Sequence, residues 1–113
     1  MDERARVHLL QMRDAAQDAL AFIVGFSEEE FLRDRRTQQA VCLSLIILGE
    51  NAIKLQDKHP EVLQYFDGIE WQNIRGMRNR LVHAYVDVNL QTVWATVSGA
   101  LPRIVQQIEA ITL

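Results

Sequence analysis

The sequence predicts an all-α protein, an up-down bundle of four main helices with one or two short extra helices. Apolar residues recur three and four positions apart almost throughout the chain, and no segment shows the period of two that marks a strand. Only two prolines and five glycines occur in 113 residues, and no linker, low-complexity tract or internal repeat divides the chain. This length and pattern favour a single helical domain over residues 1–113.

The first helix is expected roughly from Glu3 to Val24. Six apolar residues form its stripe at spacings of three and four: Leu9, Met12, Ala16, Ala19, Ile23 and Phe26. A short helix should follow, because Ser27 and Glu30 stand at the spacing of a capping box.

The second long helix is expected roughly from Arg35 to Lys58. Its centre, Val41 to Leu48, is apolar nearly all round, which predicts the buried middle of a bundle. The helix should end at His59, because the residue before Pro60 avoids the helical region.

The third helix is expected roughly from Trp71 to His83, and the fourth should begin near Asn89, a favourable N-cap. Seven apolar residues repeat the helical spacing in this last segment: Leu90, Val93, Val97, Leu101, Ile104, Ile108 and Ile111. Pro102 lies inside it and predicts a kink.

Bulk properties favour a cytoplasmic protein without a membrane partner. The one cysteine, Cys42, has apolar neighbours, and a single buried thiol fits a reducing compartment. No signal peptide is visible after Met1, and the most apolar run, of eight residues, is far below the ~20 that span a bilayer. The net charge is −3, so any nucleic-acid binding must come from a local basic patch.

Such a patch lies between Trp71 and Tyr85, which contains Arg75, Arg78 and Arg80 and no acid. At about 100° per residue, Arg78 falls in the middle of an apolar face. That face comprises Trp71, Ile74, Leu81, Val82 and Tyr85. Because a lone buried guanidinium is very costly, Arg78 needs either a carboxylate or a cavity that receives an anion. Glu50 is the natural carboxylate, and an Arg78–Glu50 ion pair between two helices is a full alternative to a binding role.

His83 follows Arg78 by five residues, about 140° around a regular helix, so the two would not face each other. They could converge if the helix ended near Leu81, or across a two-fold axis between two chains. The alternative is a histidine that only stabilises a helix C-terminus.

The string Gly76-Met77-Arg78-Asn79-Arg80-Leu81-Val82-His83-Ala84-Tyr85 resembles the signature of HEPN-domain RNases in the form found in HepT toxins. Leu48-Gly49-Glu50-Asn51-Ala52 is similar to the family's Ile-Gly-Glu-Ala segment. Ile69-Glu70-Trp71-Gln72-Asn73-Ile74 is similar to its Pro-Trp-x-x-Ile segment, with Glu70 in place of proline. Val93-Trp94 and Leu101-Pro102 match its last helix, so the resemblance covers nearly the whole chain in order.

The resemblance implies an endoribonuclease that cleaves single-stranded RNA without a metal ion, by attack of the 2′-hydroxyl on its own phosphate. Arg78 would hold the phosphate and His83 would move protons. Asn79 would orient the histidine or the phosphate. Arg75 and Arg80 are the expected RNA-binding residues, and a homodimer would form the composite cleft. We expect no cofactor and no metal, because no Cys, His or carboxylate cluster has ligand spacing.

The same resemblance implies a partner, an MntA-like nucleotidyltransferase antitoxin that transfers AMP to Tyr85, as in type VII toxin–antitoxin pairs. Tyr85 lies seven residues from Arg78, so on a continued helix both would face the same way. A phosphate added there would pair with Arg78 and block RNA. The alternative for Tyr85 is a core aromatic with its hydroxyl at the rim.

Two other functions remain open. One is a non-catalytic helical subunit that binds substrate or nucleotide for a nucleotidyltransferase. The other is a structural dimerisation bundle, which would not need an arginine on an apolar face.

Overall fold

The computed structural model describes residues 1–112, in which the chain is helical and contains no strand. The main helices are α1 (Glu3–Phe22), α3 (Arg35–Lys58) and α4 (Trp71–His83), and the C-terminal helix is α5 (Leu90–Ala95), η3 (Thr96–Ala100) and α6 (Leu101–Thr112). Three short elements are α2 (Glu28–Leu32), η1 (Pro60–Tyr65) and η2 (Tyr85–Asp87). The predicted all-α bundle is confirmed.

Side-chain caps fix where these helices begin. Ser27 and Glu30 form both halves of the capping box predicted for the short helix α2. The Asn89 side chain accepts from the Thr92 N–H at 3.0 Å and starts α5, as predicted. The first helix ends at Phe22, two residues before the expected end, and the chain then turns through Gly25 at φ +81°.

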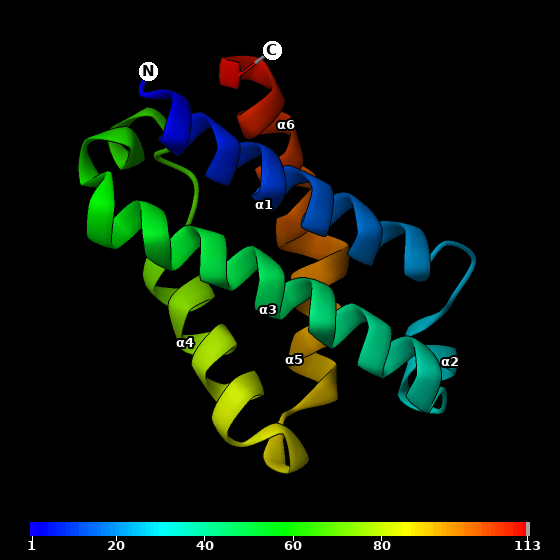
Figure 1. Ribbon diagram of the computed structural model, residues 1–113. Helices are drawn as coiled ribbons and strands as arrows, with labels where there is room; N and C mark the ends of the chain where they lie inside the picture. The colour runs from blue at the N-terminus through cyan, green and yellow to red at the C-terminus, as the bar shows by residue number, and fades with distance from the viewer. Residues whose placement is uncertain (113) are drawn as a thin grey trace.

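Two layers enclose the core. α1 and α3 lie side by side and run in opposite directions, while the C-terminal helix crosses behind them and α4 packs on α3 (Figure 1). The largest fully buried side chains come from α1, α2, α3, the residue after η1 and the C-terminal helix: Leu9, Met12, Phe31, Val41, Cys42, Leu55, Phe66, Val93, Val97, Leu101 and Ile108. No helix within residues 1–112 has the length and hydropathy to span a membrane.

The centre of α3 is not buried all round, and that expectation was wrong. Leu43 and Ile47 are 58% and 44% exposed. The helix has neighbours on its α1 and α4 sides, and no element within residues 1–112 covers the outward side on which these two residues lie. α3 therefore carries large apolar side chains on the surface of the single chain.

The predicted disturbance at Pro102 takes the form of a π-helical turn at η3, directly before it. Proline has no N–H for the carbonyl four residues earlier, and its ring crowds that carbonyl. A π turn relieves this crowding by widening the backbone. The helix thereby continues past Pro102 and keeps its apolar stripe buried as far as Ile108.

Candidate active site

The basic segment forms α4, which is seated closely against α3. A Cβ at Gly49 would overlap the Arg78 Cβ and would lie 2.8 Å from the Arg78 Cγ. Only glycine at this position lets the two helix backbones approach so closely. Gly49 thus places the Arg78 side chain directly in the seam between α3 and α4.

Arg78 reaches from this seam to the surface. Its Nη2 lies 3.5 Å from the Glu50 Oε1, and its Nη1 donates to the Asn79 Oδ1 at 2.9 Å. The Arg78 side chain is 25% exposed and that of Glu50 is 49% exposed. The Nε of Arg78 is buried without a hydrogen-bond partner. The predicted ion pair is therefore present, but it is half open to solvent and leaves one donor unused.

The apolar face predicted around Arg78 is only partly formed. Leu81 is buried, and Trp71 and Ile74 are half-buried against the core. Val82 is exposed, however, and Tyr85 is not on this helix. Val82 is exposed because α3 covers α4 on one side only, and Tyr85 is off the helix because α4 ends at His83.

His83 is the last residue of α4 and is exposed. The helix is regular up to that point, since the Ala84 N–H donates to the Arg80 carbonyl at 2.8 Å. The first route to convergence, a helix ending near Leu81, is therefore wrong. Within one chain Arg78 and His83 remain about 140° apart around the helix, while Asn79 is only about 40° from His83.

Tyr85 lies in η2, where the chain has left the helix at Ala84. The continued helix that the predicted alignment of Tyr85 with Arg78 required is therefore absent. The half-buried ring packs on the core, and its hydroxyl donates to the Cys42 thiol. Burial, and then the Cys42 sulfur, raise the pKa of Tyr85, whereas the nearby Arg35 lowers it. Arg35 is thus a basic group whose charge the phenol senses.

The two predicted RNA-binding arginines lie on different sides of α4. The Nη1 of Arg75 bonds to the Gln56 Oε1 and the Asp57 Oδ1, both at 3.1 Å, across the α3–α4 seam. Arg80 is about 200° from Arg78 around the helix and lines a cavity on the other side of α4. Only Arg75 shares the seam with Arg78.

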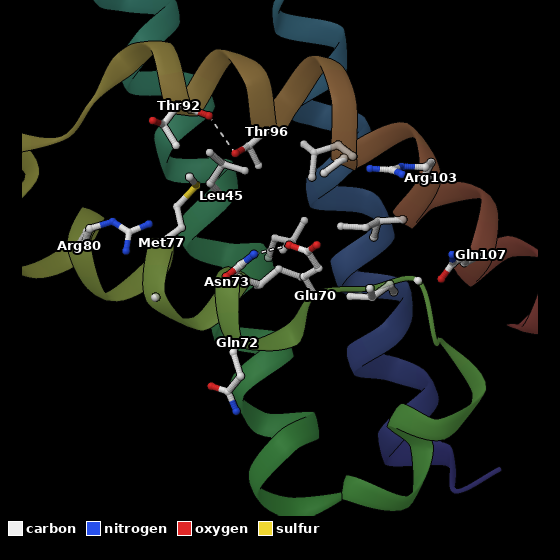
Figure 2. A pocket seen from close by; sticks show the side chains of 18 residues that line it. Leu45, Glu70, Gln72, Asn73, Met77, Arg80, Thr92, Thr96, Arg103 and Gln107 are labelled. Carbon is white, nitrogen blue, oxygen red and sulfur yellow. Dashed lines mark hydrogen bonds between the residues drawn. The ribbon is translucent and has the colours of Figure 1, made fainter.

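That cavity, of about 360 Å³, lies between α4 and the C-terminal helix. Figure 2 shows Arg80 and Arg103 on opposite sides of it, each extending toward the other. Arg103, Gln107 and Glu70 were not identified as site residues from the sequence. No sequence pattern marks these residues, because only the arrangement of α4, the segment before it and α6 brings them to one cavity.

His8 is a half-buried residue of α1. Its Nδ1 lies 2.9 Å from the Asn51 Oδ1, and its ring centroid is 6.3 Å from that of His59, which caps α3. No group of three or more His, Cys, Asp or Glu side chains among the described residues is placed to hold a metal ion.

Comparison with known proteins identifies the family of the chain. A profile described as "Ribonuclease HepT-like" matches residues 12–111, which include all of α3 and α4. The chain belongs to the HepT-like ribonuclease family. No solved structure was found to match it.

Curated relatives support the same membership of the HepT-like family. "Probable ribonuclease HepT" of Thermococcus cleftensis is 32% identical over 114 residues, covering 94% of this chain and 96% of the relative. A protein of Caldanaerobacter subterraneus subsp. tengcongensis, provisionally designated an RNase, is 34% identical over 89 residues, covering 79% and 77%. Another such protein, of Methanocaldococcus jannaschii, is 27% identical over 106 residues, covering 94% and 85%.

Proposed function

We propose that this HepT-like ribonuclease is a cytoplasmic endoribonuclease toxin that cleaves single-stranded RNA without a metal ion. The observation that carries the proposal is the presentation of Arg78, Asn79 and His83 on one regular helix. Arg78 keeps an unpaired buried Nε and only a half-exposed carboxylate partner. An arriving phosphate can therefore take the place of Glu50.

The proposed reaction needs no group beyond these side chains. The 2′-oxygen attacks the adjacent phosphorus, the bond from phosphorus to the 5′-oxygen breaks, and a 2′,3′-cyclic phosphate and a 5′-hydroxyl result. A base takes the 2′-hydroxyl proton and an acid gives one to the leaving oxygen, which is work that imidazole performs near neutral pH. Arg78 stabilises the negative charge that develops on the phosphoryl oxygens.

A homodimer would complete the site. One chain holds a single histidine at the site, and its Arg78 and His83 diverge around α4. Exposed apolar side chains flank them: Leu43 and Ile47 on α3, Val82 on α4 and Val86 on η2. A two-fold axis across this surface would bury the same patch of both chains and bring the Arg78 of one toward the His83 of the other.

Neutralisation is proposed to occur by AMP transfer to Tyr85 from an MntA-like nucleotidyltransferase. The phenol oxygen would attack the α-phosphorus of ATP, pyrophosphate would leave and the phenol proton would be lost. Tyr85 is two residues past His83, so the bulky adduct would obstruct the cleft. The Tyr85 hydroxyl must first leave Cys42, and Arg35 is a cation close enough to act on a phosphate added there.

One observation favours the alternative function, a nucleotide-binding subunit of a nucleotidyltransferase. The cavity between α4 and α6 has the size of a small-ligand site and two arginines at its rim. It is separate from the Arg78 surface, so the two functions are tested separately.

The deciding experiment compares the wild type with His83→Ala and Arg78→Ala on single-stranded RNA, in EDTA. We expect cleavage by the wild type, products ending in 2′,3′-cyclic phosphate, and a loss of at least about 100-fold in each variant, as for general acid–base and charge-stabilising groups. His59→Ala, which removes a histidine that takes no part in the proposed reaction, is the matched control and should cleave normally. Loss of wild-type cleavage in EDTA, with recovery in a divalent ion, would refute the metal-free mechanism.

A further inference from the structure

The cavity between α4 and α6 has a floor and a rim of different chemistry. Its floor is apolar and comes from three helices: Leu45, Leu48, Ile74, Met77, Leu101 and Ile104. Its volume of about 360 Å³ is near the lower limit of known ligand pockets, which start at about 300 Å³. The cavity therefore has room for one small ligand with a flat apolar part.

The rim holds two unneutralised guanidinium groups. Arg80 on α4 and Arg103 on α6 extend toward each other across the mouth (Figure 2). Within residues 1–112, neither forms an ion pair or hydrogen bond with a protein group, although the chain as a whole is acidic. Two facing arginines hold an anion with several acceptor oxygens, such as a phosphate.

The lining also holds two hydrogen-bond acceptors, beside donors such as the Gln72 amide and the Thr92 hydroxyl. The Oε1 of Gln107 is buried without a hydrogen-bond partner, and Gly68 lies directly against this amide and fixes its position. The Glu70 carboxylate lies at the same wall, where it accepts from the Asn73 amide. A ligand that satisfies these two acceptors, which we call the acceptor wall, donates hydrogen bonds, as an exocyclic amino group does.

We propose that this cavity binds one nucleoside monophosphate unit whose base carries an amino group. The phosphate lies between Arg80 and Arg103, the base covers the apolar floor, and its amino group donates to Gln107 or Glu70. The unit is either a free nucleotide or one nucleotide of an RNA strand. The inference goes beyond the proposed cleavage and does not depend on Arg78 or His83.

Calorimetric titration of the purified full-length protein with CMP and with UMP tests the proposal. The two nucleotides differ only at one edge of the base, where CMP has an amino group beside an acceptor nitrogen and UMP has a carbonyl beside a ring N–H. We expect CMP to bind at least about tenfold more tightly than UMP, from one hydrogen bond to a charged or buried acceptor.

Arg103→Gln should weaken CMP binding about tenfold or more, because it removes one charged contact to the phosphate. Arg36→Gln is the matched control, since Arg36 is exposed, lies outside the cavity and carries the same charge. Absence of saturable CMP binding at millimolar concentration, or equal binding by Arg103→Gln, would overturn the proposal. Equal binding of CMP and UMP would overturn the assignment of the acceptor wall.

RNA cleavage then distinguishes the two sources of the nucleotide. If CMP competes with RNA and Arg103→Gln changes the pattern of cut sites, the cavity holds a nucleotide of the strand. If CMP binds while the cut sites and rates of Arg103→Gln equal those of the wild type, the ligand is a free nucleotide. His83→Ala should bind CMP normally, so failure of the proposed nuclease activity would leave this result intact.

Discussion

At the residue scale, the Arg78–Glu50 ion pair contributes less to stability than the buried pair that the sequence left open would. A buried pair would cost several kcal/mol to break, but Glu50 is 49% exposed. Ion pairs this open contribute about 0–1 kcal/mol. Arg78→Ala should therefore lose cleavage while its free energy of unfolding falls by no more than about 1 kcal/mol.

Tyr85 is expected to act as a regulatory residue and to take no part in the chemistry. Burial raises the pKa of its phenol above the ordinary value of 10, so at neutral pH it stays protonated and is a poor base. Tyr85→Phe should keep most RNase activity and lose about 0.5–1.5 kcal/mol of stability with the bond to Cys42. It should also resist the antitoxin, which growth assays and mass spectrometry of co-expressed protein would measure.

Tyr65→Phe is the matched control for this substitution. Tyr65 is 56% exposed on η1, so its loss of a hydroxyl should change neither activity nor modification. A folded Tyr85→Phe protein that fails to cleave RNA would make Tyr85 a substrate-binding or catalytic group. A silenced wild type without an AMP adduct would show neutralisation by masking.

At the element scale, the α3–α4 seam depends on Gly49. A methyl group there would overlap the Arg78 side chain close to its backbone, where it cannot swing aside. Gly49→Ala should lower the free energy of unfolding by about 1–3 kcal/mol through overpacking. The higher helix propensity of alanine offsets part of this loss. It should also reduce cleavage, because Arg78 must shift. Thermal melts and RNA assays measure the two effects.

Gly99→Ala serves as the control for this change. Gly99 also lies in a helical segment, but a Cβ there would meet no atom within 4 Å. Its stability should rise slightly or stay the same, and its activity should be unchanged. A Gly49→Ala protein as stable and active as the wild type would show that the seam is looser than the structure indicates.

At the scale of the whole molecule, the proposed dimer explains the exposed apolar side of α3. Leu43→Asp should convert a dimer to a monomer, because it places a charge in an apolar interface, and should abolish cleavage by separating the two half-sites. The monomer should stay folded, since Leu43 is 58% exposed in the single chain. Light scattering at micromolar concentration and circular dichroism measure these outcomes.

Val24→Asp is the control, because Val24 is 78% exposed in the turn after α1, remote from the α3–α4 surface. It should remain dimeric and active. A monomeric wild type, or a dimeric and active Leu43→Asp protein, would place the interface elsewhere.

The sequence alone determined the helices and most of their ends, because these depend on local rules. Period-3.6 spacing, the Ser27–Glu30 box, Asn89 and Pro60 act within one or two turns of the chain, and the structure places α3 and α4 where they were predicted. The identity of the candidate motif also needed only neighbouring residues, and the family match supports it.

The tertiary structure decided what surrounds each side chain. The exposure of Leu43 depends on which sides of α3 are covered, and the direction of Tyr85 depends on the end of α4. The cavity joins residues of α4 and α6 that lie more than twenty positions apart. Such features arise from the packing of whole helices, and no local pattern encodes them, because periodicity shows which face of a helix is apolar but not what will cover it.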